Sequence, residues 1–122
     1  MDAVEGLLAY AQSRSRWSPA AAGSVREAVE RSRALAAVDP AHTPLLARSL
    51  RAAAGLMLRR GRPGEALTAA QEAVALARPA GGAALVISLG CLSEVYRALR
   101  RYEDAAAARE EADTTARSDP GD

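Results

Sequence analysis

The chain has 122 residues, of which 31 are alanine and 14 leucine, and its 16 basic residues, all arginine, nearly balance 15 acids. A net charge of +1 and an apolar content of 49% exclude a disordered chain and give no general attraction for nucleic acid. Valine and isoleucine together number only 8, so the composition predicts one all-α domain over residues 1–122.

The first residues of the chain and its single cysteine indicate where the protein is located in the cell and whether it holds a metal. No run approaches the roughly 18 apolar residues of a membrane span, and the first residues, Met-Asp-Ala-Val-Glu, are acidic where a signal peptide is basic. Cys91 has no partner for an internal disulfide, and one cysteine with one histidine, His42, is too few for a zinc site. We therefore expect a cytoplasmic protein with no membrane partner, metal or other cofactor.

Local signals place the second helix. Ser24 and Glu27 have the spacing of a capping box, in which the serine accepts from the amide of residue 27, and this predicts a helix start. Asp39–Pro40 predicts its end near Val38, because the residue before a proline is pushed out of the helical region.

Proline and glycine mark the later helices. Thr43 as N-cap with Pro44 in the first turn predicts a helix start, and Gly61 stands where a C-terminal glycine belongs. Pro63 begins another helix, with Glu65 favoured in its first turn by the helix dipole. The sequence thus predicts about six helices, at residues 2–13, 24–38, 43–60, 63–78, 83–100 and 102–117.

Apolar residues recur every three or four positions, which is the helical period. Leucine-rich helices alternate with alanine-rich ones, and small residues let a helix approach its neighbour closely. The leucine-rich stripes include Leu46, Leu50 and Met57, then Leu85, Leu89, Leu92, Tyr96 and Leu99. The alanine-rich stripes are Ala66, Ala70, Ala73 and Ala77, then Ala105, Ala112 and Ala116.

Self-comparison reveals a repeat. Three segments, beginning at residues 23, 61 and 100, align without gaps, and their starts are 38 and 39 residues apart. Each carries an alanine at the same place, namely Ala28, Ala66 and Ala105, followed by a further small or leucine position at Leu35, Ala73 and Ala112. Two helices per period predict a stack of helix hairpins, in which each hairpin buries too little surface alone and packs on the next.

Gly61 with Glu65-Ala66-Leu67, and Tyr102-Glu103-Asp104-Ala105, resemble the tetratricopeptide repeat family. The resemblance covers about residues 24–117, with a period a little longer than is usual for that family. It implies a right-handed stack of antiparallel helix hairpins, an α-solenoid, with repeats at roughly 2–40, 43–79 and 82–117. The first repeat is degenerate, because polar Ser15 and Arg16 fall where a packing helix is expected.

The resemblance also implies a concave groove lined by the first helix of each hairpin, and hence a non-catalytic module that binds a partner protein or acidic peptide. Guanidinium groups bind carboxylates with two parallel hydrogen bonds, so arginines there suit acidic ligands; alternatively, they are solvated and pair with nearby acids. The family's clamp for two carboxylates uses lysine and asparagine, which this chain lacks. The expected groove residues are Arg48, Arg51, Leu58, Arg59, Glu94 and Arg97, with Gly55, Ile87, Gly90 and Ala98 beside them.

Two other functions remain open. A small-molecule-binding regulator or a small tailoring enzyme requires titratable groups to share a cavity, but the sequence holds no known catalytic motif. A structural oligomerisation unit, such as a homodimer joined through the first helix or a terminal hairpin, would cover the open ends of the stack. The titratable set is Asp39, His42, Glu94 and Tyr96.

Two single residues have structural interpretations. Cys91 lies mid-helix beside the Leu89–Leu92 stripe, so we expect a packed thiol rather than a reactive one. Trp17 is expected to cover the open N-terminal end of the stack with its large ring.

Overall fold

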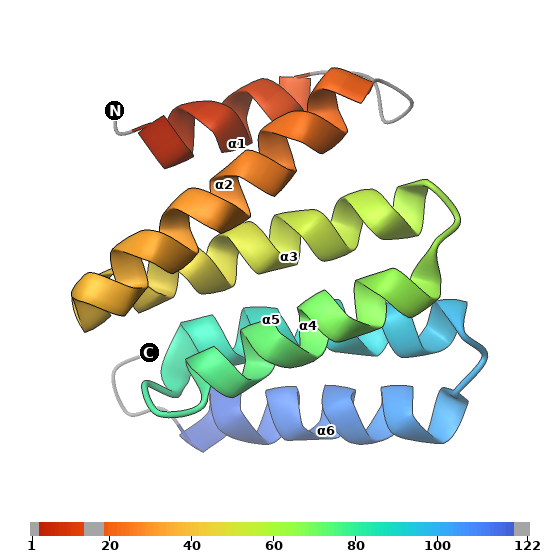
Figure 1. Ribbon diagram of the computed structural model, residues 1–122. Helices are drawn as coiled ribbons and strands as arrows, with labels where there is room; N and C mark the ends of the chain where they lie inside the picture. Colours follow the sequence, from red (N-terminus) through yellow and green to blue (C-terminus); the bar gives the residue numbers. More distant parts are fainter. Residues whose placement is uncertain (1–2, 14–18, 119–122) are drawn as a thin grey trace.

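The computed structural model describes residues 3–13 and 19–118, and within them the all-α prediction is confirmed. Helices that are neighbours in sequence pack together and run antiparallel (Figure 1). The predicted end cover, Trp17, and the polar Ser15 and Arg16 lie outside the described residues. The elements are α1 (Ala3–Ser13), α2 (Pro19–Val38), the short 3-10 turn η1 (Pro40–His42), α3 (Thr43–Arg59), α4 (Pro63–Ala77), α5 (Gly82–Ala98) and α6 (Tyr102–Ser118).

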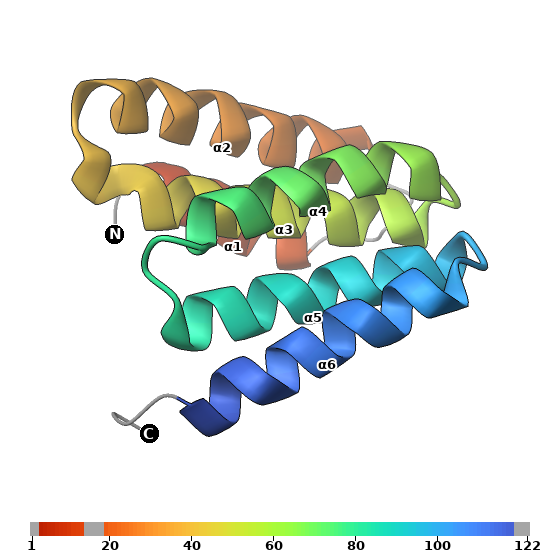
Figure 2. The same ribbon diagram turned by 90° about the horizontal axis from the view of Figure 1, so that it is seen from below.

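The helices follow one another as three adjacent pairs, α1–α2, α3–α4 and α5–α6. Each pair packs on the next, and α3 also packs directly against α5. Figures 1 and 2 both show α5 and α6 side by side, and Figure 1 shows this pair at the end of the molecule opposite α1. Among the described residues, no helix is long and apolar enough to cross a membrane.

The predicted start of α2 is wrong. The helix begins at Pro19, five residues before Ser24, so Ser24 and Glu27 form no capping box, and Ser24 is buried within the helix. Proline is compatible with a first helical position because the amide it lacks has no partner there. The predicted end at Val38 is confirmed: the Asp39 carboxylate accepts a hydrogen bond from the Ala41 amide at 3.0 Å and begins η1.

The remaining boundaries fall within two residues of those expected, but the capping residue of α3 differs. Thr43 is already helical (φ −58°, ψ −42°), and His42 stands in the N-cap position without a side-chain capping bond. The turn η1 brings the backbone close to helical geometry before α3 starts, so Thr43 is not needed as a cap.

Alanines at the predicted close-contact positions are confirmed as core residues. Ala28, Ala66 and Ala73 are 0% exposed, and Ala112 is 1% exposed. There are two exceptions: Leu35, aligned with Ala73, is 40% exposed, and Ala116, in the last turn of α6, is exposed as well. With 11 residues against 20, α1 is too short to cover the second half of α2, and Leu35 lies there.

The main core joins α3, α4, α5 and α6. Its larger members are Leu85, Leu89, Leu92 and Val95 of α5, packed against alanines and Val74 of the neighbouring helices. Ser93 adds a polar link, since its hydroxyl donates to the Ala105 carbonyl at 2.9 Å and ties α5 to α6 where the two helices approach closely.

The helices α3 and α5 end in the same way. In α3, the Arg62 amide donates to the Met57 carbonyl at 2.8 Å, and Gly61 adopts φ 73°. In α5, the Arg101 amide donates to the Tyr96 carbonyl at 2.8 Å, but the left-handed position is held by Arg100, at φ 61°. Both ends have the hydrogen bonds of a Schellman motif, which favours glycine in this position.

Replacing Arg100 by glycine is therefore expected to stabilise the chain. A side chain in the left-handed region costs about 1 kcal/mol relative to glycine, so the free energy of unfolding should rise by about that amount. Urea denaturation followed by circular dichroism measures the change. The control is Arg101→Gly, at the next residue, where no positive φ occurs; equal effects of the two substitutions would contradict the account.

Two ion pairs join successive helix pairs through α2, α4 and α6. Arg33 of α2 donates twice to the Glu72 carboxylate of α4, at 2.6 and 3.1 Å. Arg78, directly after α4, donates in the same two-pronged way to Glu111 of α6. These hydrogen bonds, assisted by the arginine charges, hold the pKa of Glu72 and of Glu111 below its usual value.

This lowering predicts a small acid sensitivity. A carboxyl group with a depressed folded pKa contributes stability that is present above its unfolded pKa and is lost as the pH falls through the folded value. The double variant Glu72→Gln/Glu111→Gln should lose about 0.5–2 kcal/mol at neutral pH, because exposed pairs are weak, and its stability should depend less on acid. Urea midpoints at neutral and acidic pH test this, with the exposed Glu110→Gln as control. Identical acid profiles for wild type and double variant would refute it.

Candidate interaction surface

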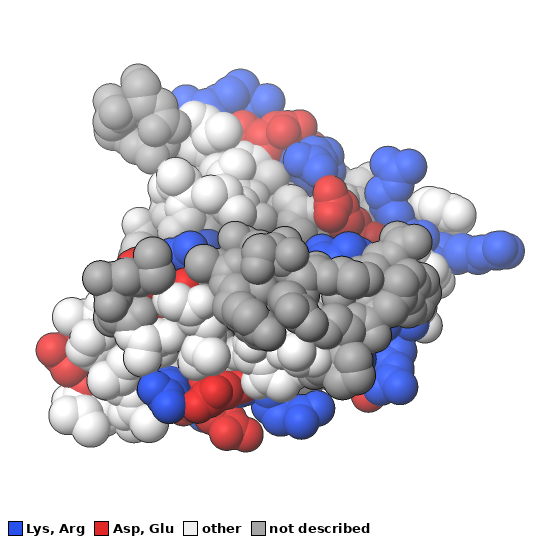
Figure 3. All heavy atoms as spheres, turned by 90° about the horizontal axis from the view of Figure 1, so that it is seen from above, with Lys and Arg blue, Asp and Glu red and all other residues white. Residues whose placement is uncertain are grey.

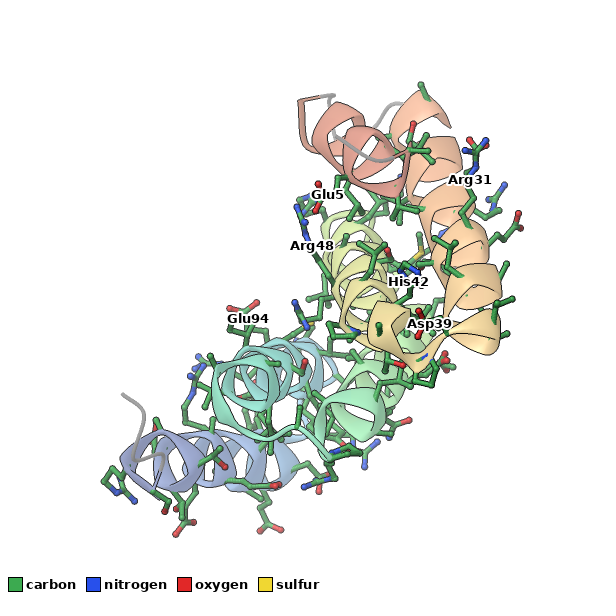
Figure 4. All side chains as sticks on the ribbon, turned by 90° about the vertical axis from the view of Figure 1, so that its left-hand side faces the viewer. Glu5, Arg31, Asp39, His42, Arg48 and Glu94 are labelled. Atoms are coloured by element: carbon green, nitrogen blue, oxygen red, sulfur yellow. The ribbon has the colours of Figure 1, made fainter. Side chains whose placement is uncertain are left out.

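Three helices, α1, α3 and α5, border a concave side of the molecule, and α2, α4 and α6 form its outer side (Figure 4). Glu5, Arg48 and Glu94 point from these three helices towards that side. Because residues three or four apart share a helix face, Arg51, Gly55 and Arg59 follow Arg48 along α3. We call this surface the concave face and define it by Glu5, Arg48, Arg51, Gly55, Arg59 and Glu94.

Arg48 forms an ion pair across the concave face. Its guanidinium lies 3.5 Å from the Glu5 carboxylate of α1, and both side chains are 46% exposed. An exposed pair at this distance contributes little to stability and can be exchanged for another acidic partner. The alternative interpretation, in which the groove arginines pair with nearby acids, therefore holds for Arg48, whose acid comes from α1.

Arg51 is the most buried arginine of this face. Its Nη1 donates to the Ser88 hydroxyl of α5 at 3.1 Å, and Ser88 is 0% exposed. Burial lowers the pKa of Arg51, and the neighbouring Arg48 charge lowers it further. Among the described residues, no carboxylate pairs with Arg51. No signal in the sequence points to Ser88 as its partner, because the two residues lie 37 positions apart.

The end of α3 supplies Gly55, Leu58 and Arg59. The Arg59 side chain folds back, so that a Cβ added at Gly55 would lie 3.3 Å from its Nη1. A hollow of about 140 Å³, lined by Leu8 of α1 together with Arg51, Gly55 and Arg59, lies there. Leu58, expected in the groove, is instead partly buried and packs against the main core.

Glu94 and Arg97 separate on α5. Glu94 is exposed on the concave face, whereas Arg97 lines a hollow of about 210 Å³ between α5 and α6, with Tyr102 and Arg109. The structure thus brings Arg48, Arg51 and Arg59 together on α3 and places Arg97 at the border with α6. Neither Glu94 nor Arg97 forms an ion pair within the described part of the chain.

The titratable set suggested for a regulator or enzyme is not gathered in one place. Figure 4 shows Glu94 well apart from Asp39 and His42. Tyr96 packs against the main core, and the Arg101 guanidinium lies 4.7 Å from the centre of its ring. Within residues 3–13 and 19–118, no group of three or more His, Cys, Asp or Glu side chains could hold a metal ion.

Cys91 lies beside Arg51 and Glu94 and is half-buried against the main core. Burial raises the pKa of its thiol, Glu94 raises it further, and Arg51 opposes the change. The thiol therefore remains protonated at neutral pH, which agrees with the expected packed cysteine.

Comparisons with known proteins assign the chain to no family. No family model matches it, and neither curated proteins nor solved structures contain a significant match.

Proposed function

We propose that the chain is a right-handed, tetratricopeptide-like stack of helix hairpins that acts as a non-catalytic interaction module. It binds an acidic peptide, or an acidic segment of a partner protein, across the concave face. The observation that carries the proposal is a row of three arginines at helical spacing along α3. Arg48 points towards the concave side, and Arg51 and Arg59 line the hollow beside Leu8 of α1.

Several features support a repeating stack. The helices pack as consecutive pairs, and the contact between α3 and α5 joins the first helices of two pairs. The left-handed positions Gly61 and Arg100 are 39 residues apart and have equivalent hydrogen bonds. A unit that recurs in both sequence and hydrogen bonding is typical of a solenoid, whose concave surface commonly binds extended partners.

The charges of the concave face support an acidic ligand. Among the described residues that define this face there are three arginines and two acids, Glu5 and Glu94. Arg48 has an exchangeable partner at 3.5 Å, and Arg51 donates to a neutral hydroxyl rather than to a carboxylate. A carboxylate of the ligand gains a charge-assisted, two-pronged hydrogen bond with each arginine that it reaches.

The test is selection from a displayed library of random peptides. We expect enrichment of aspartate and glutamate, and binding that weakens as salt is added. Alanine at Arg48, Arg51 and Arg59 together should weaken a selected peptide by at least about tenfold, since each charged hydrogen bond contributes about 1.5–3 kcal/mol.

The matched control places alanine at three exposed arginines away from the concave face, Arg31, Arg33 and Arg117. This variant changes the net charge equally and should keep most of the affinity. If both variants weaken peptide binding equally, the effect comes from the net charge and contradicts a specific site on the concave face. Failure to select any acidic peptide would contradict the proposed ligand.

A second candidate function, self-association, is supported by one observation. An open, mostly apolar hollow of about 720 Å³ lies at the α1–α2 end, and beside it Leu35 and Val38 are 40% and 88% exposed. Among the described residues, basic and acidic side chains lie next to each other around this end when it is seen from above (Figure 3). Sedimentation equilibrium of wild type and Val38→Asp tests it; a wild-type monomer at high concentration excludes this role.

A further inference from the structure

A separate cavity of about 410 Å³ lies where η1 and the start of α3 meet the turn between α4 and α5. Its walls are mainly apolar: Pro44 and Ala47 come from α3, Leu76 from α4, Pro79 from the turn and Ala84 from α5. A cavity of this size is within the range of small-molecule sites, which combine apolar walls with a few polar groups.

Arg51 supplies the charged group, and Thr43 also lines the cavity. Among the described residues that line this cavity, Arg51 is the one with a charged side chain. Its hydrogen bond to Ser88 fixes the guanidinium at the junction of α3 and α5 while using one of its five N–H donors. Partial burial without a carboxylate partner leaves a desolvated positive charge, which an incoming anion would stabilise.

We propose that this cavity binds a small carboxylic acid with an apolar chain, its carboxylate on Arg51 and its chain against Pro44, Ala47, Leu76, Pro79 and Ala84. A single arginine matches a singly charged carboxylate, whereas a phosphate carries more charge and is usually held by several cationic or amide donors. Apolar walls favour a hydrocarbon chain, because each buried CH₂ is transferred out of water.

This site goes beyond the proposed binding of a partner at the concave face, although the two have one residue in common. The two share Arg51 alone, since Arg48 and Arg59 do not line the cavity. The same chemistry occurs in a free fatty acid and in the last residue of a peptide with an apolar side chain, so the experiment includes both.

The probe is octanoate, titrated into the full chain by isothermal titration calorimetry. We expect a dissociation constant on the order of 0.1–1 mM for a ligand with about ten heavy atoms. Octanol lacks the charge, octylamine carries the opposite charge, and acetate lacks the hydrocarbon chain. Each of these compounds should bind at least about tenfold more weakly than octanoate. Acetyl-glycyl-leucine, with its amide as the uncharged counterpart, represents the end of a peptide. If octanoate binds more tightly than this peptide acid, the ligand is a free acid. If the peptide acid binds more tightly, the ligand is the end of a peptide.

The variant Arg51→Met keeps an unbranched side chain but loses the charge, and should weaken octanoate at least about tenfold, or about 1.4 kcal/mol. The control Arg117→Met removes a charge from an exposed position of α6 that does not line the cavity, and it should leave affinity unchanged. Ala84→Leu fills the cavity from α5 and should also weaken binding.

Thermal unfolding of each variant verifies that it folds, and Arg51→Lys provides a milder change of the same group. No binding of octanoate to wild type up to about 10 mM, equal binding of octanol, or unchanged affinity in folded Arg51→Met would each overturn the proposal. If octanoate binding fails in one of these ways while the acidic peptide still binds, the cavity proposal is overturned and the proposed function is not.

Discussion

Replacing Leu89 by alanine is expected to destabilise the chain by about 2–5 kcal/mol, the usual range for a buried leucine. Leu89 is 1% exposed and lies in the core that joins α3, α4, α5 and α6. Its neighbours include Ala66, Ala70 and Ala112, whose short side chains have no flexible length with which to fill the space left behind. Because the whole domain is stabilised by only about 5–15 kcal/mol, one truncation removes a large share.

The matched control for this prediction is Ile87→Ala, two residues earlier on the same helix. Ile87 is 56% exposed, so its truncation should change stability by no more than about 0.5 kcal/mol. Urea denaturation of both variants gives the comparison. A loss of less than about 1 kcal/mol for Leu89→Ala would place Leu89 outside a closely packed core.

The second large effect is expected at Gly81, the N-cap residue of α5. Its backbone has φ 63° and ψ −147°, a conformation that essentially only glycine adopts. No atom lies within 4 Å of a Cβ added there, so Gly81→Ala introduces backbone strain and no collision. We expect a loss of about 1–3 kcal/mol in the free energy of unfolding.

Gly64→Ala is the control for backbone strain. Gly64 lies in the first turn of α4, has no positive φ and also has open space around its Cβ position. Alanine there restricts the unfolded chain and should stabilise the protein by about 0.4–1 kcal/mol. Opposite signs for the two glycines, measured by thermal or urea unfolding, support the account; a neutral or stabilising Gly81→Ala contradicts it.

Most of the helices could be predicted because their ends are encoded locally. Asp39–Pro40, Gly61 and Pro63 act on their own backbone, through a restricted φ, a left-handed turn or a missing amide, so each marks a boundary without reference to the rest of the fold. The alanine stripes were equally informative, because a small residue at helical spacing indicates a close helix contact.

The errors occurred where distant parts of the chain decide the structure. Ser24 has the spacing of a cap, yet it lies inside α2 because the helix extends back to Pro19. Leu35 has the repeat position of a core residue, yet it is exposed because α1 is short. Neither the length of α1 nor its cover over α2 can be obtained from the residues around Leu35.

The candidate site was predictable in part. The resemblance to tetratricopeptide repeats implied that Arg48, Arg51 and Arg59 line a concave groove, and the structure places Arg48 on the concave side. The partners were not predictable: Glu5 and Ser88 are far from these arginines in sequence and meet them only through packing of α1 and α5 on α3.

The most direct test of the central proposal is to locate a bound acidic peptide by amide chemical shifts. With a peptide selected against the full chain, the largest shift changes are predicted in α1, α3 and α5, centred on Arg48, Arg51 and Arg59. The same titration of the triple alanine variant should leave these amides nearly unchanged. Changes concentrated instead in α2, α4 and α6 would contradict binding across the concave face.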